Sequence, residues 1–231
     1  MKNYLSFGGG VNSVALYLHL LDNDVSFEAV FVDHGTDWPE TYEYVEMFKE
    51  KYPLTVLKPE KPLYQYAWDY KMVPSQMRRW CTRIFKVEIM HKYYQKPCWQ
   101  MIGFDFGERK RAKIICEDDV ETRYPLIEAE IDREGCKNII RSHKLPMPIK
   151  SGCFICPYQR VHQWKELRRN HPGLFCKAVE LEKRNMAYRR SSGKKPLFLN
   201  PWPRAPLQKV VDENQRQLFK EDEYPPCECG L

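Results

Sequence analysis

A Cys-x-x-Cys pair is the clearest chemical signal in this sequence. Cys153 and Cys156 are separated by two residues and followed by Pro157, in a chain of 231 residues with 9 cysteines. Two thiolates at this spacing can occupy neighbouring corners of a tetrahedral zinc site or of an iron–sulfur cluster. The same spacing also occurs in redox dithiols. The pair therefore predicts either a metal centre or a redox site.

A glycine-rich segment near the N-terminus has the residue types of a phosphate-binding loop. Ser6–Ser13 follows an apolar run and contains three consecutive glycines, and residues 14–21 then have helical character. Glycines let the backbone approach an anion closely, and the start of a helix offers unpaired N–H groups and a positive dipole end. Asn12 and Ser13 add side-chain donors at the helix start. The segment predicts a phosphate site, with a glycine turn that binds no ligand as the alternative.

Composition favours an intracellular enzyme with an anionic ligand. Lys and Arg number 37 and Asp and Glu 31, a formal net charge of +6, which suits a nucleotide or nucleic-acid partner without requiring one. No run of about twenty apolar residues and no secretory signal pattern occurs, so we expect no membrane association and a cytoplasmic location. Disulfides rarely persist there, so clustered cysteines indicate metal binding or catalysis.

The elements that must position these residues follow an alternating strand and helix pattern. Short apolar runs predict buried strands, and Asp33 comes directly after one of them, where ligands of open α/β sheets bind. The alternation predicts an α/β, Rossmann-like fold with a mostly parallel sheet and helices on both faces. Strands are expected at 27–32, 54–57 and 99–102, and helices at 39–52, 63–71 and 85–94.

The second half of the chain has a different character. Residues 108–113 form a charge-dense loop, and helices are expected at 132–143, 161–170 and 173–185, followed by a basic loop from 189 to 206. We therefore expect a nucleotide-binding domain over residues 1–125. A smaller helical and loop region over residues 126–231 is expected to carry the cysteine site.

Five segments, taken in order, resemble a known family. They are Ser6–Ser13; Phe31–Gly35 followed by 39–42; Cys81–Lys86; 102–111; and Tyr124–Ile127 leading to Lys150–Tyr158. The set resembles the phosphoadenosine phosphosulfate reductase family, within the PP-loop adenine nucleotide alpha hydrolase superfamily. The likeness is to its phage and bacterial branch, which has a Cys-x-x-Cys-Pro segment and a terminal Cys-Gly.

The resemblance implies a site for the phosphates of ATP, with Mg²⁺, or of a sulfonucleotide. Many PP-loop enzymes have an aspartate where this sequence has Asn12, which leaves the loop less anionic and bears on whether ATP is cleaved or a sulfonucleotide is bound. Asp33 and Arg111 are catalytic candidates, and Arg109 and Lys113 are further phosphate-neutralising cations. The implied nucleotide-binding residues are Ser6, Phe7, Gly8, Gly9, Gly10, Asn12, Ser13, Phe31, Asp33, Gly35 and Gly103.

The resemblance also implies roles for the cysteines. Reductases of this family that carry a [4Fe-4S] cluster have mid-chain cysteines and a later Cys-x-x-Cys, a layout that Cys81, Cys153 and Cys156 match. Cys229 is the expected fourth ligand and Cys227 the alternative, unless a fourth ligand is absent and one iron stays open. Zinc is the alternative metal. Glu228–Leu231 also matches the start of the family's Glu-Cys-Gly-Leu-His motif, which makes Cys229 a candidate nucleophile instead.

Three functions are consistent with this pattern. The first is ATP-dependent adenylation and thiolation of a nucleotide or nucleic acid, assisted by an iron–sulfur cluster and supplied by a sulfur donor. The second is a sulfonucleotide reductase, in which Cys229 attacks the sulfur of the substrate and a thiol reductant releases sulfite. The third is a non-catalytic nucleotide or nucleic-acid binder with a structural metal.

Overall fold

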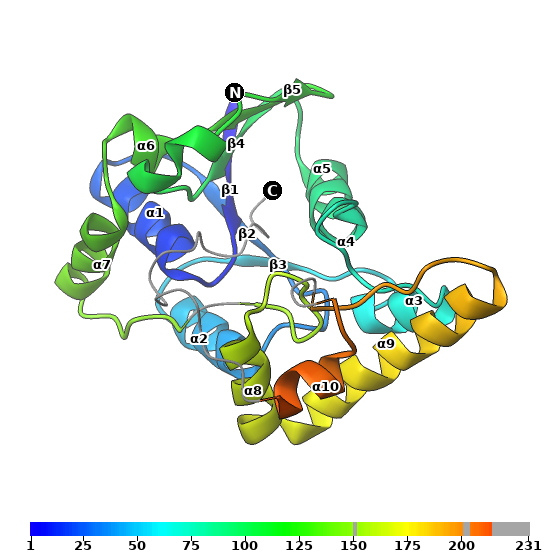
Figure 1. Ribbon diagram of the computed structural model, residues 1–231. Coiled ribbons are helices and arrows are strands. Elements are labelled where there is room, and N and C mark those ends of the chain that lie inside the picture. The colour runs from blue at the N-terminus through cyan, green and yellow to red at the C-terminus, as the bar shows by residue number, and fades with distance from the viewer. Residues whose placement is uncertain (150–151, 201–203, 214–231) are drawn as a thin grey trace.

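The fold is built on a six-stranded sheet that is parallel except at one edge. The computed structural model describes residues 1–149, 152–200 and 204–213 (Figure 1). Strand order is β3-β2-β1-β4-β6-β5, and only β5 runs antiparallel, against β6. The strands are β1 (Lys2–Phe7), β2 (Glu28–Val32), β3 (Thr55–Leu57), β4 (Cys98–Ile102), β5 (Cys116–Glu117) and β6 (Val120–Arg123).

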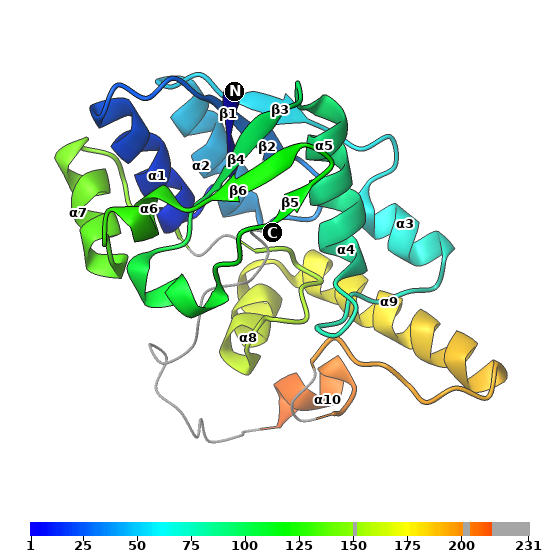
Figure 2. The same ribbon diagram turned by 90° about the horizontal axis from the view of Figure 1, so that it is seen from above.

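Helices connect and cover these strands, as Figure 2 shows from above. The first half of the chain contributes α1 (Val11–Asp22), α2 (Pro39–Lys49), α3 (Leu63–Asp69), α4 (Trp80–Thr82), the π-helical turn η1 (Arg83–Val87) and α5 (Glu88–Tyr93). The second half contributes the 3₁₀ helix η2 (Phe106–Arg111), α6 (Pro125–Glu128), α7 (Arg133–Ser142), α8 (Val161–Asn170), α9 (Pro172–Ser191) and α10 (Leu207–Asp212).

Alternating side chains of the central strands fill two separate cores. Leu5 and Phe7 of β1 pack in a buried cluster with residues of α1, α2 and α7, whereas Tyr4 packs with Met90 of α5 on the opposite face. Successive strand residues point to opposite faces, so a parallel strand covered on both sides must be apolar throughout. The predicted α/β fold with helices on both faces is confirmed.

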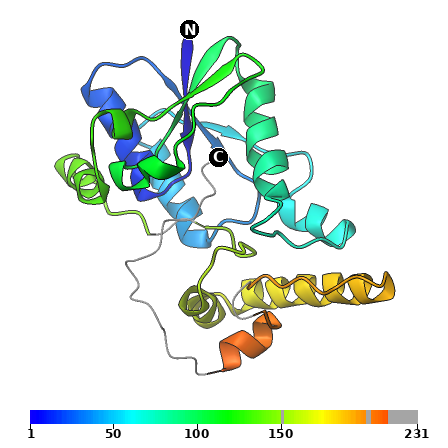
Figure 3. The same cartoon turned by 45° about the horizontal axis from the view of Figure 1, so that its top comes forward.

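A third cluster lies beyond the carboxyl ends of the parallel strands. Figures 1 and 3 show α8, α9 and α10 gathered at that end of the sheet. Their apolar side chains, including Trp164 and Leu181, pack with residues of α3 and α4 and with the buried 153–156 segment. The helical region therefore forms the floor beneath the edge at which ligands of such sheets bind.

The cores do not follow the expected boundary at residue 125. Leu126, Cys136 and Ile140 belong to the first core, where α7 packs along α1, whereas residues of α3 and α4 belong to the cluster shared with α8–α10. The apolar face of α7 packs on α1, a helix that covers the sheet. The members of each core therefore do not follow the order of the chain. The segment from 125 to 145 packs with the first half of the chain.

Several elements differ from the sequence-based expectations. Helix α2 ends at Lys49 rather than near residue 52, because Pro53 disfavours helical backbone in the residue before it. The charge-dense 108–113 segment is largely helical, and α9 extends to Ser191. The β5–β6 hairpin, turning at Asp118 and Asp119 with positive φ angles of 55° and 57°, was not predicted.

Among the helices of the described residues, none combines the length and apolar character that crossing a bilayer requires.

The buried carboxyl group of Glu182 ties two segments that follow α9 to that helix. Glu182 is 1% exposed, and its two oxygens accept the backbone N–H groups of Leu199 (2.8 Å) and Leu207 (2.6 Å). Burial raises the pKa of this carboxyl, and the two N–H donors oppose that shift. One side chain therefore satisfies donors in two segments that have no ladder partner there.

Replacing this carboxyl should destabilise the fold. Glu182→Gln leaves one acceptor oxygen and turns an amide N–H₂ toward a buried N–H, so we expect a loss of about 1–3 kcal/mol in the free energy of unfolding, measured by urea titration. Glu180→Gln, on an exposed position of the same helix, is the control and should change it by less than about 0.5 kcal/mol. Equal effects of the two variants would contradict the assigned role.

Candidate functional site

The glycine loop leaves the N-terminus of α1 uncapped. Gly10 is the N-cap residue, and no side chain caps this end. The Ser13 hydroxyl donates to the Gly10 carbonyl oxygen (3.0 Å), which stabilises the first turn. Because a twelve-residue helix begins here with backbone N–H groups that lack side-chain acceptors, this end can bind an anion.

Two glycines are required by close contacts around this loop. Gly9 has a φ angle of +69°, and a Cβ there would lie 3.1 Å from Val45 and 3.3 Å from Thr41 of α2. Gly103 ends β4, and a Cβ there would lie 3.0 Å from backbone atoms of Asn12 and Ser13. The loop is thus enclosed by α2 on one side and by the end of β4 on the other.

Asn12 has a role that its sequence position did not indicate. Its amide nitrogen donates to Asp105 (3.0 Å) and to Glu108 (2.8 Å), and its oxygen accepts from Arg133 of α7 (2.5 Å). Asn12 is 7% exposed. The expected donation of this side chain to a phosphate is not seen, because both amide hydrogens are bound by carboxylates. Asn12 instead joins α1 to the η2 turn and to α7.

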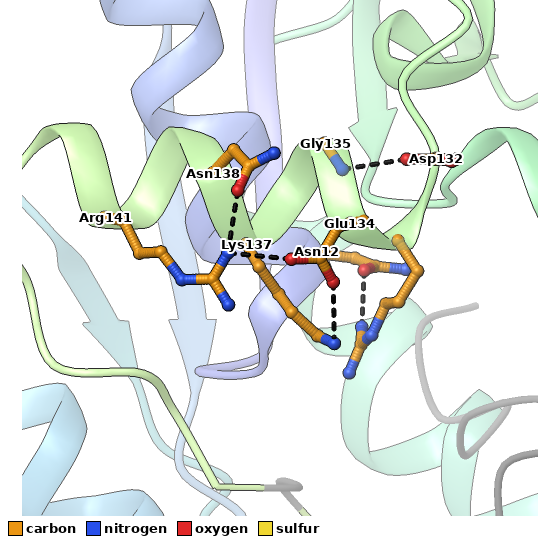
Figure 4. Close-up of polar contacts among 8 residues, drawn as sticks. Asn12, Asp132, Glu134, Gly135, Lys137, Asn138 and Arg141 are labelled. Atoms are coloured by element: carbon orange, nitrogen blue, oxygen red, sulfur yellow. Dashed lines mark hydrogen bonds and ion pairs between the residues drawn. The ribbon is translucent and has the colours of Figure 1, made fainter.

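The first turn of α7 is itself held by local polar contacts (Figure 4). Asp132 caps the helix by accepting the N–H of Gly135 (2.8 Å), and Glu134 pairs with Lys137 and Arg141. These contacts fix the helix end from which Arg133 reaches Asn12. The surface pairs contribute little energy individually, so the cap and the buried Asn12 contact determine the geometry.

Arg111 belongs to the same network. It forms an ion pair with Glu108, and its guanidinium lies 4.7 Å from the centre of the Phe104 ring. Burial raises the pKa of Glu108, and the Arg111 charge opposes that shift. The structure therefore places Arg111 beside the contacts that hold the first turn of α1. Nearby, the guanidinium of Arg109 lies 4.7 Å from the centre of the Phe106 ring.

The end of β2 lies beside the glycine loop, since β2 pairs with β1 in the sheet. The Asp33 carboxylate accepts the N–H of Gly35 (3.0 Å) and lies 3.3 Å from the Lys58 ammonium. Gly35 has a φ angle of +77°, which allows the chain to turn away after the strand. Because β1 pairs in parallel with both β2 and β4, the ends of these three strands lie together at one edge of the sheet.

Some predicted nucleotide-binding side chains point elsewhere. Phe7 and Phe31 are each 3% exposed and lie in the core with α1 and α2. The centres of the Phe7 and Phe48 rings are 4.9 Å apart. The Ser6 hydroxyl lies 3.5 Å from the sulfur of Met90. For the two phenylalanines, the prediction of nucleotide contact is wrong at the side chain, because their strand positions face a covered side of the sheet.

Cys81, Cys153 and Cys156 line one cavity. The other walls come from α3 and the 74–86 segment, and the full lining is His34, Leu63, Pro74, Ser75, Arg79, Cys81, Thr82, Lys86, Cys153, Cys156, Pro157 and Tyr158. We refer to this cavity as the thiol pocket. The predicted convergence of the three cysteines on one place is seen, although Cys81 is more than 70 positions from the other two along the chain.

The thiol pocket is anchored to the loop after β2. Asp37 and Cys153 form an antiparallel bridge, and the N–H of Phe154 donates to the Thr36 carbonyl oxygen (2.8 Å). The Cys153 thiol donates to the Thr36 hydroxyl (3.1 Å), which also lies 2.8 Å from a ring nitrogen of His34. The cysteine segment is therefore fixed against the same sheet edge that carries the glycine loop.

The donor chemistry of the thiol pocket suits a soft metal, but the placement is not that of a formed site. Three thiols are the ligands that iron–sulfur clusters and zinc prefer. Among the described residues, however, no group of three His, Cys, Asp or Glu side chains is arranged to hold a metal ion. Burial raises the pKa of the Cys153 thiol, whereas a ligand must be a thiolate. The residues present supply suitable donors for a soft metal, and the metal itself stays a prediction.

Cys227 and Cys229, predicted as fourth ligand or nucleophile, lie outside the described residues. Sequence analysis did not single out His34 and Thr36. Thr36 accepts hydrogen bonds from Cys153 and Phe154, and a ring nitrogen of His34 lies beside the Thr36 hydroxyl. Their signal was present, because both follow directly on the strand end at Asp33.

The Asn12 network generates a stability prediction. Asn12→Asp restores the aspartate common in PP-loop enzymes, but here it replaces two donors by a carboxylate facing Asp105 and Glu108. We expect the free energy of unfolding at pH 7 to fall by about 2–4 kcal/mol, although Arg133 keeps an acceptor.

The pH dependence should identify the cause. Crowding raises the carboxyl pKa values in the folded state, so the stability lost at neutral pH should return as the pH falls through those raised values. Urea titrations from pH 7 to pH 5 measure this. A deficit in Asn12→Asp that is independent of pH would contradict the explanation.

Comparison with known proteins agrees with the fold. A phosphoadenosine phosphosulfate reductase domain model matches residues 2–112. Two uncharacterized proteins of Methanocaldococcus jannaschii are 26% and 22% identical over 205 and 196 residues, covering 79% and 74% of this chain. These alignments cover 49% and 39% of the relatives, so the chain spans about half of their length or less.

A solved structure shares the architecture. The phosphoadenylyl-sulfate (PAPS) reductase from Candida auris, determined as a phosphate complex, superposes with a TM-score of 0.51 at 16% identity. The match covers 64% of this chain and 75% of that one. Since this identity is low, the likeness concerns the fold. Residues 2–112, slightly less than half of the chain, are therefore similar to the phosphoadenosine phosphosulfate reductase domain.

Proposed function

We propose that this protein binds ATP and uses it for adenylation and thiolation of a nucleotide or nucleic acid. The observation that carries the proposal is the position of the thiol pocket. Its cysteine segment is bonded to the loop after β2, and β2 lies beside the strand that leads into the glycine loop. A phosphate-binding helix end and three thiols therefore serve the same edge of the sheet.

The first half of the reaction is an adenylation. An oxygen of the acceptor bonds to the α-phosphorus of ATP while the bond to pyrophosphate breaks. The N–H groups at the start of α1 and the backbone of Gly8–Gly10 are suited to bind the phosphates. Mg²⁺, as a partner of ATP, would neutralise further phosphate charge.

The second half transfers sulfur. Sulfide from a donor bonds to the activated carbon, and AMP leaves with the acceptor oxygen, so no net redox change is needed. The chain's part is to bind the acceptor near the thiol pocket and to exclude water, which would hydrolyse the adenylate. A [4Fe-4S] cluster held by Cys81, Cys153 and Cys156 alone would leave one iron open for sulfide, whereas Cys229 as fourth ligand would fill that position. Zinc is the alternative metal.

A sulfonucleotide reductase is the second candidate. The family match over residues 2–112 favours it. In that reaction a thiolate bonds to the substrate sulfur, the phosphosulfate S–O bond breaks, and an added thiol releases sulfite by forming a disulfide. Cys229 would be the nucleophile. The two candidates differ in their products. Thiolation yields AMP and a thionucleotide, whereas the reductase yields sulfite.

The reaction can be tested with purified protein. Incubation with Mg-ATP, sodium sulfide and either a mononucleotide mixture or an unmodified RNA transcript should release AMP and form a sulfur-containing nucleotide, measured by mass spectrometry. Gly9→Ala should weaken ATP binding tenfold or more, because strain of about 1–3 kcal/mol falls on the loop. Gly193→Ala, with a similar φ of +65° in open space, is the control. Sulfite release from phosphoadenosine phosphosulfate and dithiothreitol, without ATP turnover, would favour the reductase.

The metal can be tested separately. Protein purified without oxygen should contain iron and acid-labile sulfide and absorb broadly near about 400 nm, the thiolate-to-iron charge-transfer region. Cys81→Ser and Cys153→Ser should each abolish the absorption, whereas Cys176→Ser, an exposed cysteine on α9, should not. Colourless protein with about one zinc per chain would show that the site holds zinc instead of a cluster. Protein without either metal would refute the metal site.

A further inference from the structure

The positive charge of this protein is concentrated in one part of the chain. Residues 160–213 contain 13 Lys and Arg against 5 Asp and Glu, a net charge of +8. Residues 1–159 contain 22 of each and are neutral overall. One of the five acids, Glu182, is buried and turned to backbone donors. The surface formed by α8–α10 is therefore strongly cationic.

The cations are densest at the far end of α9. Lys183, Arg190, Lys194 and Lys195 are exposed, and within the described part of the chain none of the four forms an ion pair. After α9 the chain reverses at Gly193, where the Lys194 N–H donates to the Arg189 carbonyl oxygen (2.8 Å). This turn holds the two lysines against the helix end.

Two further cations lie over aromatic rings, on the seam between α3 and α9. Arg184 of α9 lies 4.6 Å from the centre of the Trp68 ring, and Lys71 lies 5.0 Å from that of Tyr188. Asn185 donates to the Lys71 carbonyl oxygen (2.7 Å), which fixes the seam. Tyr188 is 41% exposed and Tyr70, at the end of α3, is 57% exposed. We refer to Tyr70, Lys71 and Tyr188 with Arg190, Lys194 and Lys195 as the α3–α9 surface.

The α3–α9 surface adjoins the thiol pocket through α3. Leu63, at the start of α3, and Pro74 and Ser75, just after it, line the pocket. A helix of seven residues is about 10 Å long, so the exposed tyrosine at its other end lies within a few nucleotides' reach. Figures 1 and 2 both show α3 beside the distal part of α9.

We propose that the α3–α9 surface binds a single-stranded segment of nucleic acid and presents it to the thiol pocket. Lys and Arg side chains bind the phosphates, and exposed aromatic rings stack on unpaired bases, a combination typical of single-strand binding. A duplex hides its base faces and would use only the cations. The inference rests on the proposed function and narrows its acceptor from a free nucleotide to a polynucleotide.

Binding can be measured without turnover. Fluorescence anisotropy of the full-length protein, without ATP or sulfide, would use a labelled 12-nucleotide RNA of mixed sequence, the same sequence as DNA, and the RNA annealed to its complement. We expect either single strand to bind more tightly than the duplex. A preference between RNA and DNA would identify which sugar is recognised.

Two sets of variants separate the phosphate and base contributions. Arg190→Gln with Lys194→Gln and Lys195→Gln should weaken binding at least tenfold and reduce the salt slope by about 2, since each lost phosphate contact on a single strand removes about 0.7. Tyr188→Ala or Tyr70→Ala should weaken it about 5- to 150-fold with the slope unchanged. Lys49→Gln with Lys51→Gln and Lys92→Gln removes the same charge from α2, the residues after it and α5, and should have little effect.

Several results would overturn the inference. These are duplex binding as tight as single-strand binding, an equal loss in the α2 and α5 control, or unchanged binding in both tyrosine variants. Urea titration of each variant shows whether it is folded. If the strands do not bind but a mononucleotide is thiolated, this inference fails while the proposed function stands. If the strands bind but ATP is never consumed, the proposed function fails while this inference stands.

Discussion

The hydrogen bonds of Asn12 hold the uncapped N-terminal end of α1 from inside the protein. A helix end that is to bind an anion must leave its N–H groups free, so it cannot be stabilised by an N-cap side chain in the usual way. Here the support comes from one buried amide that joins Asp105, Glu108 and Arg133. Buried polar groups with all partners present specify a single geometry.

Gly103 makes that arrangement sterically feasible. Any side chain at the end of β4 would meet the backbone of the first turn of α1. The end of β4, the first turn of α1 and the η2 turn are consequently packed as one unit, and this packing sets the shape of the glycine loop between β1 and α1. Substitution of an acid at position 12, which suits other PP-loop sequences, conflicts with this particular set of neighbours.

The thiol pocket depends on a different set of contacts. Its cysteines come from α4 and from the 153–156 segment, and the latter is attached to the loop after β2 by an isolated bridge and by the Thr36 hydroxyl. Beneath it, Trp164 and Leu181 of the C-terminal helices complete the core. The same helices bear the excess positive charge, so one structural addition to the nucleotide-binding half provides both the floor of the pocket and a surface suited to a polyanion.

The sequence by itself determined the α/β class, the parallel strands and the glycine loop, because buried strands and βα turns leave local patterns of apolar residues and glycines. It also singled out Cys81, Cys153 and Cys156. It did not indicate the place of Asn12, the core role of Phe7 and Phe31, or the packing of α7 on α1. Only the tertiary structure decided these, because they depend on which groups meet across long stretches of chain, more than 90 residues in the contacts of Asn12 with Asp105 and Glu108. Local patterns carry no information about such meetings, and the partner of a polar side chain is set by the fold around it.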